Sequence, residues 1–476
     1  MKDDRSEDYR ESLTLTSEDK QEKDNYSNKR SSDSDLNGMF SATDNVVYQT
    51  EENLLNSDEK ISFFGISNDS QISVIINIVS SAIGGSCFNF PSILDILGLP
   101  CTLVVFTLIM ISIYYTIDLL RSFVVDTRYF SFALISEKIL GSIWMKIYVI
   151  CSLIFYLSIE INYISEIYSI VSKMVGISGN DYIKIIIYFI LTLLFEIFIC
   201  SYTSNIKKIH IFSFLSIIFF LIILITVIIL GILNLSSEEN KLAYSSFITP
   251  NIDNNLELFF IINSFSIEYI YGYSYHSSFP TLLGNFQNHI EEENTKNVHI
   301  ISFIIISISY LLMTFFGYLL KSKVPEILFI DDESFQENTS LKIIFKLILC
   351  LFLFIVISLR FIVIRDNYTS LFGKQKIAYT KDLIATSICL IFCNIITYFT
   401  SENKLGYNII SYFIQLFGGI FGIIICYFLP VINYIGVNGK RKIKSIIGYI
   451  LTIFFLIVGI ISVFHSVHGI FFSDKY

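Results

Sequence analysis

Charge is scarce in this sequence, and the short motifs of common catalytic sites are missing from it. Only 16% of its 476 residues are charged, against about 25% in soluble globular proteins. This excludes a soluble enzyme, a disordered protein and a nucleic-acid binder. There is no glycine-rich phosphate loop followed by lysine, no His-Glu-x-x-His and no nucleophile elbow. We therefore expect no enzyme and no ATP-driven pump.

What the sequence does contain is long runs of Ile, Leu, Phe and Val, with 53% apolar residues and a mean hydropathy of +0.62. A run of about 18 such residues can span a bilayer as a helix, and the runs lack the alternation of a porin-type strand. The fold class expected is an all-α polytopic membrane protein with eleven transmembrane helices. The predicted spans are 70–97, 99–120, 143–170, 181–203, 209–234, 256–281, 298–321, 341–364, 382–400, 406–432 and 445–471.

The first 68 residues differ from the rest. They hold 8 Lys or Arg and 16 Asp or Glu, and such a segment cannot bury enough apolar surface to offset its loss of conformational entropy. We predict a disordered acidic cytoplasmic tail over 1–68 and an eleven-helix domain over 69–476. With the N-terminus in the cytoplasm, fourteen Lys or Arg fall in inner loops and six outside, as the positive-inside rule requires. The plasma membrane and a vacuolar or other organellar membrane both stay open as locations.

Two predicted spans contain helix-weakening residues at mid-membrane. In the first span, Gly84 and Gly85 are adjacent and Pro91 follows. In the sixth, Gly272 lies in a run of Tyr, Ser and His ahead of Pro280. Each glycine weakens a helix by about 1 kcal/mol relative to alanine. Both spans are therefore expected to be interrupted.

An interrupted span can bind charged groups with its unwound backbone. Unwound backbone inside a membrane is tolerated only around a cavity lined by protein. Free N–H groups at the start of a half-helix bind a carboxylate, and freed carbonyl groups hold an ammonium group or a cation. The two spans are five apart, as expected for an inverted repeat of 70–234 and 256–432 with an extra helix at 445–471. Close helix packing is the alternative use of the glycines.

Four segments carry a recognisable pattern. They are 77–91 with Ile83-Gly84-Gly85-Ser86 at its centre, the aromatic-small-aromatic run 271–276, the run 310–319 with its Gly-Tyr ending, and 417–430, which closes on Pro. In order and spacing they resemble the first, sixth, seventh and tenth helices of the amino acid/auxin permease family. Arg365 fits the Arg commonly seen after that family's eighth helix.

The resemblance implies a leucine-transporter-type core and symport of amino acids with protons or sodium. It implies that the substrate site is formed by Ile83, Gly84, Gly85, Ser86, Tyr163, Tyr271, Gly272, Tyr273 and Ser274. Where sodium-coupled members tend to place Asn in the first helix, this chain has Ser80, and an acidic position of the third helix matches Asn162. Both departures favour proton coupling or uncoupled transport.

Ionisable residues inside spans are functional candidates because their burial is costly. The candidates for ion coupling are Asn77, Ser80, Glu160, Asn162, Glu268, His276 and Ser358. Glu160 either carries a proton or pairs with an arginine, and His276 is either a proton relay or a hydrogen-bonded packing residue. Arg360 either serves the site or extends toward the cytoplasmic end. Glu166 and Glu196, which lie nearer the span ends, are expected to form pairs with an arginine. We expect no metal site and no cofactor other than H⁺ or Na⁺ as coupling ion.

The function predicted is a monomeric secondary transporter of amino acids that works by alternating access in the lipid bilayer, with no nucleic-acid partner. An amino acid-sensing, receptor-like protein with little flux is the alternative. A channel would need a continuous polar lining, and a sugar facilitator of the twelve-helix class would need an Asp-Arg-rich loop after the second span. Neither pattern is present in the sequence.

Overall fold

The computed structural model describes part of the chain. The described residues are 62–63, 66–67, 70–175, 182–202, 206–235, 255–284, 286, 290–320, 339–371, 379–401, 416–438 and 443–472. Most of the predicted tail, 1–61, lies outside them. At its end, β1 (Ser62–Phe63) and β2 (Ile66–Ser67) form a small antiparallel pair. Every other element in the described part of the chain is helical.

Helices lie in each of the intervals predicted to span the membrane. The first half contains α4 (Gln71–Ala82), η1 (Gly85–Phe88), α5 (Phe90–Thr127), α6 (Phe132–Leu140), α7 (Ser142–Val175), α8 (Tyr182–Tyr202) and α9 (Ile206–Leu235). The second half contains α11 (Asn255–Gly272), α12 (Ser278–Leu283), α13 (Glu292–Leu320), α14 (Thr339–Leu371), α15 (Tyr379–Ser401), η6 (Gly418–Gly422), η7 (Ile424–Phe428), α17 (Leu429–Asn438) and α18 (Ile443–Phe472). The start of the tenth predicted span, 406–415, lies outside the described residues.

Eight of the described helices are each long and apolar enough to cross a membrane. Their outward surfaces carry large apolar side chains, such as Ile111, Ile229 and Phe454, which are exposed. Exposed apolar surface of this extent is stable in contact with lipid, and helices satisfy their own backbone groups there. The all-helical membrane fold is therefore confirmed, while the count of eleven spans and the repeat boundaries stay predictions.

The first and second predicted spans are joined by a tight bend. Helix α5 contains the end of the first span and all of the second, and Gly98 interrupts it with φ of +70°. Glycine adopts this left-handed backbone without the clash that a Cβ would cause. Pro100 follows two residues later and begins the second span. The kink lies where the sequence predicts the end of the first span.

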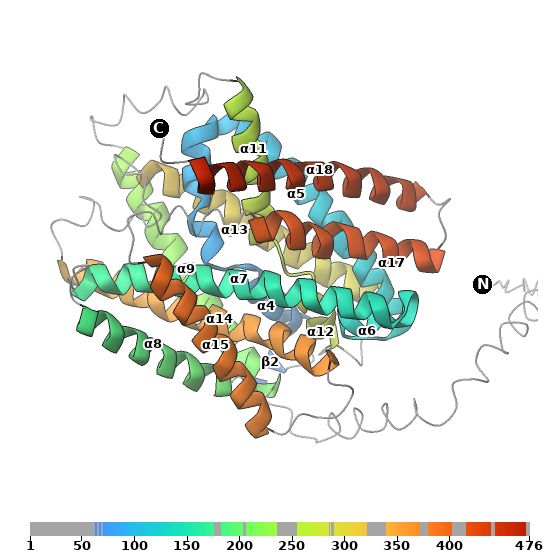
Figure 1. Cartoon of the computed structure of the whole chain (residues 1–476), viewed down its shortest axis with the longest axis horizontal. Coiled ribbons are helices and arrows are strands. Elements are labelled where there is room, and N and C mark those ends of the chain that lie inside the picture. The colour runs from blue at the N-terminus through green and yellow to red at the C-terminus, as the bar shows by residue number, and fades with distance from the viewer. Residues whose placement is uncertain are drawn as a thin grey trace, which may run out of the picture. The chain divides into compact units, whose positions relative to one another are not determined.

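The interrupted helices pack at the centre of the domain. Helix α4 contacts α9 and α13, and α11 contacts α5 and α18. Helix α7 lies along α14 (Figure 1), the pair with the most extensive contact among the described elements. This arrangement directs side chains of α7, α13 and α14 toward the two breaks.

The tenth span is wound more loosely than an α-helix. Both η6 and η7 are π-helical turns that lead into α17, and π-turns are frequent at functional sites. Helix α18 packs closely against this segment, because Gly459 faces the backbone of Gly419. Small residues allow such close approach between helices in membranes.

We expect Gly459→Leu to destabilise the protein. A Cβ at Gly459 would overlap the carbonyl oxygen of Gly419 and the side chain of Ile423, and overpacking costs about 1–3 kcal/mol. A lower midpoint of thermal unfolding in detergent is the expected result. Ile460→Leu is the control, because Ile460 is exposed on the outer face of α18. An unchanged midpoint for Gly459→Leu would contradict the observed packing.

Candidate substrate site

The first predicted break is present. Helix α4 ends at Ala82, and the backbone of Ile83 and Gly84 is extended before η1 begins at Gly85. Within the described residues, no acceptor hydrogen-bonds to the N–H of Gly84, Gly85 or Ser86. Free N–H groups at the start of a helical segment attract anions. The gap therefore suits a carboxylate.

The glycines of this break let α7 approach it. A Cβ at Gly84 would overlap the hydroxyl of Tyr163 and lie 3.0 Å from Arg360 Nη2. A Cβ at Gly85 would overlap a carboxylate oxygen of Glu166 and lie 2.8 Å from the Tyr163 ring. The sequence left two roles open for these glycines, a helix break and close helix packing. The structure shows both.

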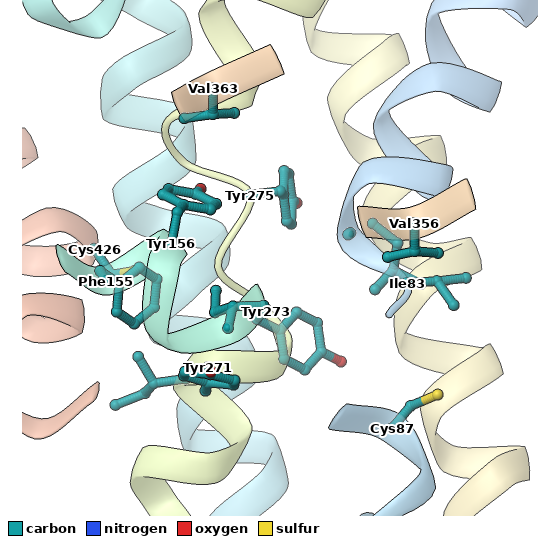
Figure 2. Packing of buried hydrophobic residues seen from close by; sticks show 14 of the residues in the cluster. Ile83, Cys87, Phe155, Tyr156, Tyr271, Tyr273, Tyr275, Val356, Val363 and Cys426 are labelled. Atoms are coloured by element: carbon teal, nitrogen blue, oxygen red, sulfur yellow. The ribbon is translucent and has the colours of Figure 1, made fainter. Parts of the chain in front are cut away.

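The second predicted break is also present. Helix α11 ends at Gly272, and five non-helical residues follow before α12 begins. The carbonyls freed there have side-chain partners. Ser274 Oγ donates to the carbonyl of Tyr271 at 2.7 Å, and Tyr156 Oη donates to that of Ser274 at 2.9 Å. Figure 2 shows the side chains of Tyr271 and Tyr273 beside this segment. The carbonyl of Tyr271 also accepts from the N–H of Ser274 at 3.4 Å. Because a carbonyl oxygen has two lone pairs, the carbonyl of Ser274 can accept a further donor.

One tyrosine joins the two breaks. Tyr310 Oη on α13 lies 2.8 Å from the carbonyl oxygen of Ala82 and 2.9 Å from that of Gly272, the last residue of each half-helix. The ring of Phe90 lies 5.2 Å from the Tyr310 ring and faces Gly272. The two breaks therefore lie side by side, as a shared site requires.

One face of α7 brings ionisable groups to the first break. Glu160, Tyr163 and Glu166 follow at three-residue intervals and are buried, and this spacing places them on one side of the helix. Asn162 Nδ2 donates to Glu166 Oε1 at 2.9 Å. Neither oxygen of Glu160 has a hydrogen-bond partner among the described residues, nor has Glu166 Oε2. Glu166 is therefore at the break and not near a span end, which corrects the sequence interpretation.

Arg360 also points at the first break. It is 2% exposed, so it does not extend toward the cytoplasmic end, and that alternative is wrong. Its Nη2 donates to the carbonyl of Ala82 at 3.3 Å, and its guanidinium carbon lies 5.3 Å from the centroid of the Tyr163 ring. A cation over a tyrosine face is stabilised by the ring quadrupole. Helix α14 thus supplies a positive charge beside the free N–H groups.

Two of the ion-coupling candidates lie in a different place. Asn77 and Ser80 line a small cavity between α4, α9, α12 and α14, together with Ser81, Ser213 and Ser278. The cavity has room for about one water molecule. Asn77 Oδ1 and Ser213 Oγ are buried in it without a hydrogen-bond partner among the described residues. Oxygen atoms of this kind can bind a small cation, although the wall of the cavity is mainly apolar.

The remaining candidates for ion coupling are His276, Ser358 and Glu268. His276 Nε2 lies 2.9 Å from Thr116 Oγ1. Ser358 Oγ donates to the carbonyl of Ile355 in its own helix at 2.7 Å. Glu268 is half-buried, one turn ahead of the second break. Glu196 accepts from Asn394 at 2.8 Å, so the partner shown for it is an amide and not the expected arginine.

The sequence interpretation missed Tyr310 and Tyr156 as site residues. Both are buried, and both donate to carbonyls at the breaks. A tyrosine in a chain with 29 of them carries no local signal of such a role. Only the packing of α7 and α13 against the breaks reveals it.

A helical membrane domain in which two interrupted spans meet, with polar groups gathered between them, has the architecture of a leucine-transporter-type membrane transporter. The family described as "Transmembrane amino acid transporter protein" matches residues 67–472. The chain therefore belongs to this family, and the resemblance found in the sequence is confirmed.

Solved structures show the same fold. The manganese transporter of Eremococcus coleocola, in complex with an aromatic bis-isothiourea substituted compound, has a TM-score of 0.58 at 12% identity, over 88% of this chain and 92% of that chain. A histidine-to-alanine variant of that transporter has a TM-score of 0.56 at 12% identity, over 86% and 89% of the two chains. A glutamate-to-glutamine variant has a TM-score of 0.56 at 13% identity, again over 86% and 89%. No curated protein matches the sequence.

Proposed function

We propose that this membrane transporter carries amino acids by alternating access, with the substrate held between the two breaks. The proposal depends on one observation: groups that attract a carboxylate and groups that attract an ammonium ion lie at two neighbouring breaks. The first break offers free N–H groups and the guanidinium of Arg360. The second offers carbonyl oxygens from Tyr271 to Ser274. An amino acid has a carboxylate for the first and an ammonium group for the second.

Arg360 is the group at the first break that favours a carboxylate over a metal cation, whereas the carboxyl group of Glu166 beside Gly85 acts in the opposite sense when it is ionised. At a separation of about 4 Å, two unit charges interact by about 4 kcal/mol in a partly buried setting. The guanidinium of Arg360 therefore attracts an anionic group and repels a divalent cation placed at the same point. The Eremococcus coleocola relatives are manganese transporters by their description, so Mn²⁺ is the cation to compare in uptake experiments.

The rings around the breaks favour a neutral side chain on the substrate. Tyr163, Tyr271 and Tyr273 are buried. Tyr163 faces Gly84 and Gly85 of the first break, and Tyr271 and Tyr273 lie beside the second (Figure 2). Aromatic rings present large apolar faces, and their hydroxyl groups need partners when buried. The hydroxyl of Tyr163 interacts with the side chain of Ser86, and that of Tyr271 with the side chain of Ser158, without close hydrogen-bond geometry in either case. We infer that these tyrosines contact the side chain of the substrate.

Two sites are candidates for the coupling ion. Glu160 is a buried carboxyl that can carry a proton. The cavity lined by Asn77, Ser80 and Ser213 offers oxygen ligands to Na⁺. Facilitated diffusion without either ion is the third arrangement. A cytoplasmic N-terminus, a monomeric state and a plasma or organellar membrane belong to the same proposal.

Uptake into vesicles tests the function. We expect purified full-length protein in liposomes to take up radiolabelled amino acids from a mixture faster than protein-free liposomes do. Imposed proton and sodium gradients distinguish the coupling ions, and a parallel uptake of radioactive Mn²⁺ tests metal transport. Binding of amino acids without uptake would instead support the receptor-like alternative. Uptake of Mn²⁺ but of no amino acid would refute the proposal.

A further inference from the structure

The first break is flanked by two buried side chains that can carry opposite charges. Nη2 of Arg360, on α14, lies 3.0 Å from the point where Gly84 would carry a Cβ. Oε2 of Glu166, on α7, lies against the corresponding point of Gly85. Arg360 is 2% exposed and Glu166 is 5% exposed. A basic and an acidic group therefore face adjacent residues of the same unwound backbone.

Each of these two side chains has polar atoms without a hydrogen-bond partner in the described part of the chain. Glu166 Oε1 accepts from Asn162 Nδ2 at 2.9 Å, but Oε2, the oxygen beside Gly85, has no donor. Arg360 donates from Nη2 to the carbonyl of Ala82 at 3.3 Å, while Nε and Nη1 have no acceptor. Buried charged groups are unfavourable without partners. Both side chains can therefore bind a ligand without losing an existing hydrogen bond.

The two side chains do not pair with each other. Among the ion pairs of the described residues, none joins Arg360 to Glu166. The side chain of Tyr163 spans the two glycines instead, because its hydroxyl lies against Gly84 and its ring carbons lie 2.8 Å from the Cβ position of Gly85. A single ligand that carries both signs of charge can therefore provide a partner for each of the two groups.

We propose that Glu166 binds the ammonium group of the substrate while Arg360 binds its carboxylate, so that the site selects zwitterions over acids without an ammonium group. This inference rests on the proposed function, because it assigns the selectivity of the same site to a residue. The second break supports it. The Cβ position of Gly272 lies 3.5 Å from the hydroxyl oxygen of Ser86, the residue after Gly85. The carbonyl oxygens of the second break therefore lie near Glu166 and attract the same ammonium group.

Asn162 fixes the direction in which the carboxyl group of Glu166 faces. It lies one turn earlier on α7, and its amide holds Oε1, so Oε2 is the oxygen left for a ligand. A group that is already oriented loses less conformational entropy on binding. Glu196 of α8 has the same arrangement, because Asn394 donates to its Oε2 and its Oε1 has no partner among the described residues. No atom of Glu196 is among those nearest to the glycines of either break, so Glu196 is a matched control.

Competition between close analogues measures the selectivity of the unmodified protein. The full chain in liposomes takes up the radiolabelled amino acid that the vesicle assay identifies. The competitors are its 2-hydroxy acid, in which a hydroxyl replaces the ammonium group, and the amine that lacks the carboxylate. We expect each to compete about thirtyfold more weakly than the amino acid, or worse, because each lacks one buried charge partner. A hydroxy acid that competes equally well overturns the inference but leaves the proposed function intact. A protein that binds and carries no amino acid overturns the function itself.

Glu166→Gln tests whether this residue provides the selectivity. With the purified variant in detergent, we expect the affinity for the amino acid to fall about thirtyfold or more, and that for the hydroxy acid to fall by less than about fivefold. Glu196→Gln, the same change at the matched glutamate, should leave both affinities unaltered. Equal losses for the two ligands in Glu166→Gln, or no loss for either, would overturn the inference.

A second variant keeps the charge at this position. If Glu166→Gln does not fold, Glu166→Asp takes its place, because it retains a carboxylate but withdraws it from Gly85 by one methylene group. We expect the same selective loss of affinity for the amino acid, in smaller degree. A folded Glu166→Asp with the selectivity of the unmodified protein would count as the contrary result.

Discussion

Gly84→Leu is expected to abolish most of the transport while the protein still folds and inserts. A Cβ at this position already overlaps the hydroxyl of Tyr163 and comes within 3.0 Å of Arg360 Nη2. A leucine side chain would also fill the space in front of the free N–H groups. Overpacking costs about 1–3 kcal/mol, and each 1.4 kcal/mol is about a factor of ten in binding. We therefore expect uptake to fall by about tenfold to a hundredfold.

The control for Gly84→Leu is a substitution to leucine on the outer surface of the domain. Val104 on α5 is 60% exposed, so Val104→Leu adds volume to the outer surface of the domain. Its uptake should equal that of the unmodified protein at the same amount of inserted protein. If Gly84→Leu transported as well as Val104→Leu, the first break would not be part of the substrate site.

Tyr310→Phe is expected to lower both transport and stability. The hydroxyl of Tyr310 serves the terminal carbonyls of both half-helices, Ala82 and Gly272. Without it, the carbonyl of Gly272 loses this buried donor, and Ala82 keeps only the bond from Arg360. An unsatisfied buried polar group costs about 1–3 kcal/mol. We expect roughly tenfold lower uptake and a lower midpoint of thermal unfolding.

A tyrosine hydroxyl that bonds elsewhere provides the control. Tyr115 of α5 donates to the carbonyl of Lys444, at the start of α18. Tyr115→Phe also removes one hydrogen bond, so it should lower stability, but its uptake per folded molecule should stay unchanged. Equal loss of uptake in both variants would mean that the effect of Tyr310→Phe is a general loss of stability.

The same hydrogen bonds suggest how the domain moves between its two open states. Tyr310 holds the ends of α4 and α11 together, and Tyr156 holds the unwound segment after α11 to α7. Under the proposed mechanism, α4 and α12 swing about the breaks, because extended residues absorb backbone rotation more easily than helical ones. Conformational equilibria of this kind respond to the differential affinity of the substrate for the two states.

Local features of the sequence determined the membrane fold and both breaks. Long apolar runs can satisfy their backbone groups in lipid only as helices, so composition alone identifies α5, α7, α9 and α14 as spans. Glycine weakens a helix, yet Gly459 lies inside the unbroken helix α18. The two breaks were predicted from glycine together with its neighbours, namely the adjacent pair Gly84 and Gly85 ahead of Pro91, and Gly272 ahead of Pro280.

The tertiary structure alone decided which buried side chains meet at those breaks. Arg360 lies within an apolar run, and the sequence is equally compatible with a side chain turned to the centre or to the membrane surface. Glu166 and Tyr310 were likewise placed only by the packing of α7 and α13. The physical reason is that a helix fixes the spacing of its side chains along one axis, whereas the direction they face depends on its rotation and crossing angle against other helices, which distant contacts set.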